Sequence, residues 1–102
     1  MSKGYWIAHI SVHDPDGYTQ YTDRNGAVYA KYGGRLLVRG GTFEAVEGEA
    51  RDRNVVVEYP SYEAALAAYR SPEYAEAKKY RQASSDGELL VIEGYDGPQP
   101  GE

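Results

Sequence analysis

Six short segments with regular hydrophobic periodicity follow one another in the order strand, helix, strand, strand, helix, strand, and this order constrains the fold more than any other feature. With short connections, such a chain forms a four-stranded antiparallel sheet with its helices on one face. The 102 residues suit one domain, which we place at 1–94, followed by a disordered glycine- and proline-rich tail at 95–102. The sequence therefore predicts a single α+β domain.

Capping residues mark the ends of the predicted helices. Asp14 and Pro15 follow the first strand, 5–12, as an N-cap and a first-turn proline. Gly33-Gly34 ends this helix, because glycine adopts the left-handed C-terminal conformation at little cost. Ser71-Pro72 repeats the start signal inside the second helical region, which we therefore divide in two. The remaining predicted segments are a second strand at 35–39 that continues through 42–46 after a break at Gly40-Gly41, a hairpin turn at 47–49, a third strand at 54–59, helices at 62–70 and 73–83, a loop at 84–87 and a last strand at 88–93.

Alternation along the strands divides the predicted sheet into two faces. The face expected under the helices holds Trp6, Ala8, Ile10, Leu36, Val38, Val55, Val57, Leu90 and Ile92. The opposite face holds Tyr5, Ile7, His9, Leu37, Arg39, Val56, Glu58, Leu89, Val91 and Glu93. This second face is too apolar to remain in water, and no helix is left to cover it. We therefore expect a homodimer in which two sheets pack face to face around a partly polar cavity.

Charge and composition exclude several function classes. The formal net charge of -5 gives no attraction to phosphates, so nucleic acid is not an expected partner. The chain has no cysteine, and its two histidines, His9 and His13, stand too far apart along a strand to share a metal ion, so neither a metal nor a cofactor is predicted. No apolar stretch is long enough for a signal peptide or a membrane span, so we expect a cytoplasmic protein.

Several short motifs carry a resemblance to a known family. They are Gly4-Tyr5-Trp6-Ile7-Ala8, Asp14-Pro15, Lys31-Tyr32-Gly33-Gly34-Arg35, Val38-Arg39-Gly40-Gly41, Val55-Val56-Val57-Glu58-Tyr59-Pro60-Ser61, and Ser71-Pro72-Glu73-Tyr74 with Arg81. In this order they resemble domain-of-unknown-function family 1330, a set of short bacterial proteins, from about Gly4 to Gly94. The resemblance implies a ferredoxin-like fold that dimerises into an α/β barrel, as in muconolactone isomerases and cofactor-free antibiotic-biosynthesis monooxygenases. It implies no particular reaction.

His9, Glu58 and Arg39 are the candidate catalytic residues. The first and third strands are neighbours in this topology, so His9 and Glu58 could lie side by side, where the carboxylate would orient the imidazole for proton transfer. The alternative is a histidine that only satisfies a hydrogen bond or lies in the dimer interface. Arg39 could stabilise a carboxylate or enolate, or it could form a structural ion pair with Glu58.

Tyr74, Arg81 and Tyr5 are the candidate ligand-binding residues. Tyr74 and Arg81 are seven positions apart on one helical face, where they could close over the cavity or pack at the dimer edge. Tyr5 lies on the mixed sheet face, and a tyrosine ring suits the wall of a wet pocket.

Two functions fit these residues. The first is a cofactor-free isomerase or oxygenase of a small, acidic or aromatic metabolite, with His9 as acid and base, Glu58 as its orienting partner and Arg39 as anion stabiliser. The second is a non-catalytic dimer that binds a small ligand or has a structural role. The two are separated by whether Arg39 and Glu58 neutralise each other.

Overall fold

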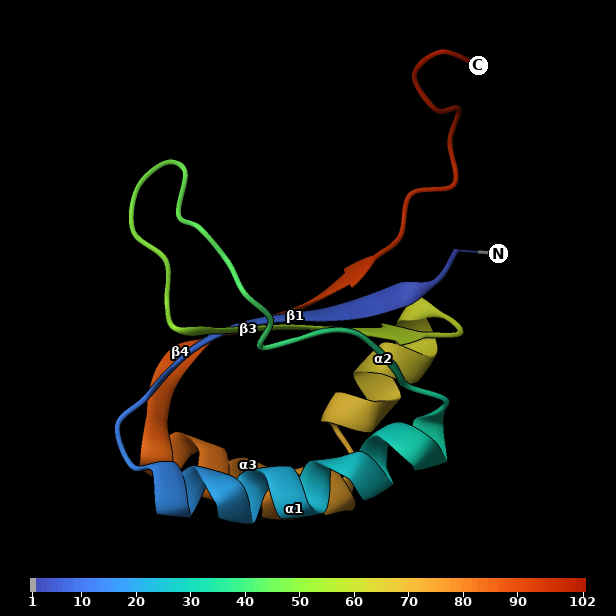
Figure 1. The fold of residues 1–102 in the computed structure, drawn as a ribbon. Helices are drawn as coiled ribbons and strands as arrows, with labels where there is room; N and C mark the ends of the chain where they lie inside the picture. The colour runs from blue at the N-terminus through green and yellow to red at the C-terminus, as the bar shows by residue number, and fades with distance from the viewer. Residues whose placement is uncertain (1) are drawn as a thin grey trace.

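The computed structural model describes residues 2–102, and its strands form one antiparallel sheet in the order β2-β3-β1-β4. The elements are β1 (Gly4–Val12), α1 (Pro15–Tyr32), β2 (Arg35–Arg39), β3 (Arg53–Tyr59), α2 (Tyr62–Tyr69), α3 (Pro72–Ser84) and β4 (Ser85–Glu93). All three helices lie on the same side of the sheet (Figure 1). The predicted ferredoxin-like α+β fold is therefore confirmed, including the division of the second helical region into two.

The predicted caps form as expected. The Asp14 side chain accepts a hydrogen bond from the backbone N–H of Gly17, and Gly33 ends α1 with a φ of 75°. Ser71 caps α3 by accepting a hydrogen bond from the backbone N–H of Tyr74 at 3.1 Å. These bonds satisfy N–H groups that have no partner inside the helix.

Trp6 lies at the centre of the core between the sheet and the helices. Only 2% of its surface is exposed, and its indole N–H donates a 2.8 Å hydrogen bond to the carbonyl oxygen of Ala65. Four tyrosine rings have centroids between 4.8 and 6.0 Å from the indole, those of Tyr29, Tyr59, Tyr69 and Tyr74. Eight of the eleven tyrosines of the chain lie in this core or pack against it.

The predicted continuation of the second strand through 42–46 is wrong, as is the hairpin turn at 47–49. β2 ends at Arg39, and residues 40–52 contain no strand. Gly40 has a φ of 62°, and its N–H donates to the carbonyl oxygen of Asn54 at 2.9 Å. This left-handed residue turns the chain away from the sheet at the point where the strand was expected to resume.

A β-bulge reverses the predicted faces of β2 after Leu36, which itself lies on the helix side as predicted. Leu36 pairs with Val57, but Val38 then pairs with Val56, so Leu37 is the extra residue. The bulge places Arg39 opposite Val55 and on the helix side of the sheet. The expectation that Arg39 shares a face with Glu58 is therefore wrong, because one inserted residue exchanges the two faces.

The predicted faces of β4 are also reversed. Leu89 and Val91 pack against the core, whereas Leu90 and Ile92 are 47% and 48% exposed. The strand begins at Ser85, directly after α3, so the predicted loop at 84–87 does not exist. All four apolar positions of this strand are adjacent, so alternation alone could not show which pair faces inward.

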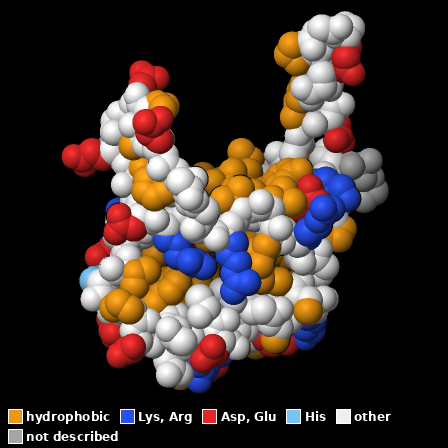
Figure 2. Space-filling view, in the orientation of Figure 1, with side chains coloured by type: hydrophobic (Ala, Val, Ile, Leu, Met, Phe, Trp, Pro, Cys, Tyr) orange, Lys and Arg blue, Asp and Glu red, His pale blue; other side chains and the backbone are white. Residues whose placement is uncertain are grey.

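The sheet face opposite the helices is open and lies between two projecting segments. Figure 1 shows the loop 40–52 and the C-terminal residues standing away from the sheet on this side, and Figure 2 shows hydrophobic side chains gathered between them. The loop and the C-terminal segment carry exposed apolar side chains of their own, including Val46 at 80% and Tyr95 at 69%. None of the helices within residues 2–102 is both long and apolar enough to cross a membrane.

Candidate functional site

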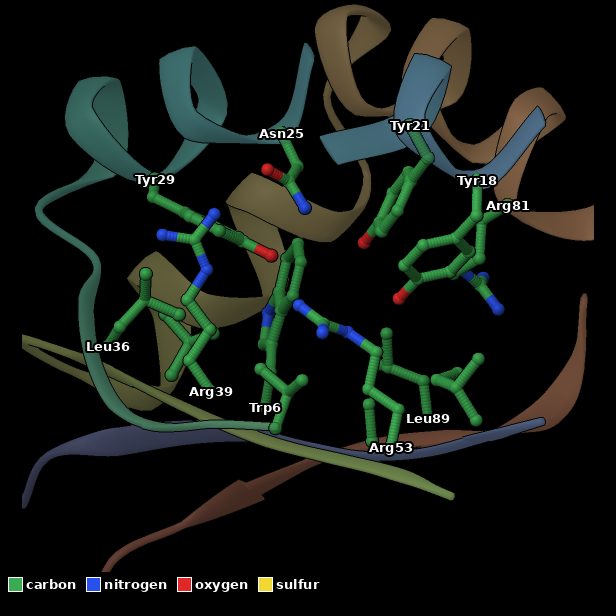
Figure 3. A pocket seen from close by; sticks show the side chains of 14 residues that line it. Trp6, Tyr18, Tyr21, Asn25, Tyr29, Leu36, Arg39, Arg53, Arg81 and Leu89 are labelled. Atoms are coloured by element: carbon green, nitrogen blue, oxygen red, sulfur yellow. The ribbon is translucent and has the colours of Figure 1, made fainter. Parts of the chain in front are cut away.

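A pocket lies between the sheet and the helices, with the buried edge of Trp6 in its floor. Its free volume is about 20 Å³, enough for a water molecule, so lining side chains must move to admit a larger ligand. Apolar side chains from the sheet form one wall, and the polar side chains around it are Tyr18, Tyr21, Asn25, Tyr29, Arg39, Arg53 and Arg81. The pocket therefore combines an apolar floor with three guanidinium groups, as Figure 3 shows.

Arg81 enters the pocket from α3 and is held by tyrosines. It is 8% exposed, and its Nε donates to the Tyr74 hydroxyl at 3.2 Å. The hydroxyls of Tyr74 and Tyr21 share a hydrogen bond of 2.9 Å. Burial raises the pKa of both hydroxyls far above the ordinary tyrosine value, so both stay protonated and act as donors. These hydrogen bonds hold the Arg81 guanidinium in place and leave its positive charge uncompensated.

Arg53 comes from the first position of β3 and points into the middle of the pocket (Figure 3). Its guanidinium carbon lies 5.5 Å from the centroid of the Tyr18 ring. Its Nε is buried and has no hydrogen-bond partner among residues 2–102. A buried N–H of this kind costs free energy unless something accepts its hydrogen bond. Gly40 leaves room for the Arg53 guanidinium, because a Cβ at position 40 would lie 2.8 Å from one of its nitrogens.

Arg39 extends from β2 into the same pocket, at the end where Tyr29 lies (Figure 3). Within the described chain it takes part in none of the hydrogen bonds or ion pairs that hold other charged residues. The Arg-Gly-Gly motif thus has a physical basis: the arginine supplies a free guanidinium, and Gly40 turns the chain and leaves room for Arg53.

The charges of the pocket are all of one sign. Its lining includes three arginines and no aspartate or glutamate. The four ion pairs found within residues 2–102 join other residues at the surface. Three positive groups beside apolar side chains repel one another and attract an anion. The arrangement suits a ligand with a carboxylate, enolate or phenolate group.

The predicted pairing of His9 with Glu58 does not form. In the sheet register, His9 is opposite Asn54, and Glu58 is opposite Tyr5. The Tyr5 hydroxyl donates to the Glu58 carboxylate at 3.1 Å, and burial followed by this hydrogen bond raises the pKa of Tyr5. Adjacent strands were predicted correctly, but the register separates the two residues by four positions. A shared catalytic role for His9, Glu58 and Arg39 stays a prediction without geometric support.

His9 instead borders a second hollow, on the open face of the sheet beneath the loop 40–52. Its Nδ1 lies 2.7 Å from the Asn54 side-chain oxygen, which accepts the hydrogen bond. Arg51 binds the Glu88 carboxylate through two hydrogen bonds of 2.7 and 2.9 Å, which hold the pKa of Glu88 below its ordinary value. Arg51 is therefore paired, whereas Glu49 and Asp52, which also line this hollow, take part in none of the ion pairs found within residues 2–102. No group of three or more histidine, aspartate or glutamate side chains within residues 2–102 is placed to hold a metal ion.

The remaining sequence candidates are divided between the two faces. Arg81 lines the pocket, and the Tyr74 hydroxyl accepts its hydrogen bond and holds it in place. Tyr5 lies on the open face of the sheet. Sequence analysis missed Arg53, although it shares the inward phase of β3 with Val55 and Val57, and a charged residue in that phase was the available signal. Sequence analysis also did not name the three tyrosines of α1 that line the pocket, which are Tyr18, Tyr21 and Tyr29.

The family profile for a domain of unknown function, DUF1330, matches residues 3–95. The chain belongs to the DUF1330 family. The resemblance expected from the motifs is therefore confirmed, and it covers nearly the whole of this DUF1330 protein. No curated protein matches the sequence.

Solved structures show the same fold. RPA0582 from Rhodopseudomonas palustris, a protein of unknown function, is 24% identical with a TM-score of 0.77, covering 94% of this DUF1330 chain and 85% of its own. SnoaB, a cofactor-independent oxygenase from Streptomyces nogalater, is 16% identical with a TM-score of 0.63, and each chain is fully covered. A dimeric ferredoxin-like protein of unknown function from Bacteroides fragilis is 13% identical with a TM-score of 0.60, covering 89% of this chain and 95% of its own.

The free state of Arg39 leads to a stability prediction for this DUF1330 protein. Arg39→Met should leave the free energy of unfolding unchanged or raise it, because the change removes one of three mutually repelling charges and strands no carboxylate. Chemical denaturation of the ligand-free protein measures this. A loss of about 3–5 kcal/mol would instead show that Arg39 has a structural partner.

Proposed function

We propose that this protein binds a small organic anion in the pocket between its sheet and its helices. The observation that carries the proposal is the set of three arginines around one apolar-floored pocket without a carboxylate. The buried, unpartnered Nε of Arg53 supports it further, because an anionic oxygen would satisfy this donor. The apolar floor favours an anion with a hydrocarbon or aromatic body over an inorganic ion.

The chemistry of the pocket favours stabilisation of an anion over proton transfer by a side chain. Arginines and protonated tyrosines donate hydrogen bonds, and such donors stabilise an enolate or phenolate as it forms. Isomerisation through His9 is not favoured, because this residue lies on the other face of the sheet. We therefore favour a substrate that ionises by itself, held as its anion for reaction with oxygen. The likeness in fold to a cofactor-independent oxygenase supports this class of reaction.

The alternative function is binding without catalysis. It uses the same arginines, and the lack of a neutral-pH base among the lining residues favours it. The two functions are separated by whether the bound acid is consumed together with oxygen.

We also propose that the protein is a homodimer that joins two open sheet faces. The exposed Leu90 and Ile92, and the apolar Val46 and Tyr95 on the projecting segments, would be covered by the same contact. A dimeric protein of the same fold supports this assembly. A cytoplasmic location, the disordered state of 95–102 and the absence of a nucleic-acid partner stay predictions.

A thermal-shift screen of small acids, neutral metabolites and amines tests the proposed ligand class. Ligands that bind the native state raise the melting temperature, and we expect such ligands among the acids. Arg53→Met should weaken their binding by about tenfold to a hundredfold, the value of a charged hydrogen bond. Arg70→Met is the matched control, because Arg70 is exposed at the end of α2 and does not line the pocket. Ligands found only among neutral compounds or amines, or binding that Arg53→Met leaves unchanged, would contradict the proposal.

A further inference from the structure

The loop 40–52 and the C-terminal segment rise from opposite ends of the strands, on the same side of the sheet (Figure 1). The loop leads into β3 at Arg53, which is paired with Ile10 near the end of β1. The C-terminal segment leaves β4 at Glu93, which is paired with Gly4 at the start of β1. The hydrophobic side chains of the open face lie between these two segments (Figure 2), so a partner that covers them must fit between the segments.

Residues 41–50 of the loop have little support from their own chain. All ten are exposed, and none takes part in a backbone–backbone hydrogen bond found within residues 2–102. Phe43 and Val46 are nevertheless apolar, and 48% and 80% of their surfaces are exposed. Large apolar side chains on a projecting segment are typical of a surface that contacts another chain.

The loop is also strongly acidic, and the other end of the open face is not. Four of its residues are acidic and one is basic, Arg51, which is already paired with Glu88. The acidic residues are Glu44, Glu47, Glu49 and Asp52. At the other end, Arg35 begins β2 opposite Glu58, is exposed, and takes part in none of the ion pairs found within residues 2–102. Two such loops would repel each other in a dimer, whereas a loop beside Arg35 would be attracted to it.

We propose that each copy in the dimer places its loop 40–52 over the start of β2 in the other copy, beside Arg35. This inference rests on the proposed homodimer and specifies how the two copies are oriented. A two-fold axis that crosses the strands at right angles brings the opposite ends of the two sheets together, so the same contact forms twice. The two acidic loops then lie at opposite ends of the dimer.

The sheet leaves space for this contact. β2 and β4 are its two edge strands, so the C-terminal segment that follows β4 lies at the edge away from β2. Leu37 and Val38 of β2 are 46% and 43% exposed, and Phe43 and Val46 of the partner's loop would cover them. The contact would therefore bury apolar side chains of both copies beside a rim of opposite charges, as in other protein interfaces.

Cysteine cross-linking tests the orientation, because the native chain contains no cysteine. A short bifunctional maleimide is added at micromolar protein concentration, and the products are separated on a denaturing gel. Arg35→Cys combined with Val46→Cys should give mainly covalent dimer. Val46→Cys alone should remain mainly monomeric on the gel, and so should Val46→Cys combined with Arg70→Cys, since Arg70 lies at the end of α2 on the helix side of the sheet.

Exchange of charges provides an independent test by analytical ultracentrifugation. Arg35→Glu should weaken the dimer by about tenfold, because each dimer contains this contact twice. Glu47→Lys added to Arg35→Glu should restore most of the lost affinity. Arg70→Glu is the matched control, since it makes the same change of charge away from the open face and should leave the affinity unchanged.

The outcomes separate the orientation from the dimer itself. Efficient cross-linking of Val46→Cys alone, a double variant with Arg35→Cys that reacts no better than the one with Arg70→Cys, or a charge exchange that restores nothing would overturn the orientation and leave the dimer. A native protein that ultracentrifugation shows to be monomeric at micromolar concentration would overturn both.

Discussion

Replacing Trp6 with alanine should lower the free energy of unfolding by about 3–5 kcal/mol, the usual cost of removing a large buried aromatic side chain. The indole is 2% exposed and lies among the rings of four tyrosines. Its removal would also leave the carbonyl oxygen of Ala65 without the hydrogen bond that it now accepts. A domain of this size has about 5–15 kcal/mol of stability, so the variant should be only marginally folded.

Urea denaturation followed by circular dichroism measures this effect. Gln82→Ala is the control, because Gln82 is exposed on α3, away from the open sheet face, and this change should alter the free energy of unfolding by less than about 0.5 kcal/mol. Similar losses for the two variants would show that Trp6 does not organise the core.

Val56→Asp should abolish self-association and lower the melting temperature at the same time. Val56 lies at the centre of the open face, where it pairs with Ile7 of β1 and Val38 of β2. A carboxylate buried there between two sheets without a partner would cost several kcal/mol. Light scattering should therefore give twice the 11.3 kDa monomer mass for the native protein and the monomer mass for the variant.

Ala75→Asp is the control for the added charge, since Ala75 is exposed near the start of α3. It should remain dimeric with nearly the native melting temperature, because an acidic residue is tolerated near a helix N-terminus. A native protein that is monomeric at micromolar concentration, or a Val56→Asp protein with unchanged mass, would show that the open face contacts water.

Local signals predicted the elements of the fold well. Asp14-Pro15 and Gly33-Gly34 mark the ends of α1, and Ser71-Pro72 marks the start of α3, because each of these residues satisfies a specific backbone requirement. The inward phase of β1 was equally clear, since Trp6 and Ile10 alternate with more polar residues. Caps and strand alternation can be predicted because they depend only on residues that are close in the sequence.

The faces of β2 and β4 could not be predicted in the same way. The bulge at Leu37 lies in an edge strand, where bulges are common, and nothing in the residues of β2 shows where the pairing shifts. In β4 every central residue is apolar, so either phase satisfies the pattern.

Of these two differences, the bulge in β2 is the one that affects a candidate residue. Arg39 was placed with His9 and Glu58, whereas it belongs with Arg53 and Arg81. The second group of residues comes from three elements and depends on register, bulge and helix packing together. Sequence did identify Arg39, Tyr74 and Arg81 as residues of interest, through the motifs that they occupy.

A crystal structure of the protein with the tightest-binding acid from the thermal-shift screen tests the central claim most directly. We predict that the acid lies between the sheet and the helices, with a carboxylate oxygen within hydrogen-bond distance of the Arg53 Nε and the body of the ligand over the apolar floor. An acid bound on the open face of the sheet beside His9, or at a surface without Arg39, Arg53 and Arg81, would contradict the account.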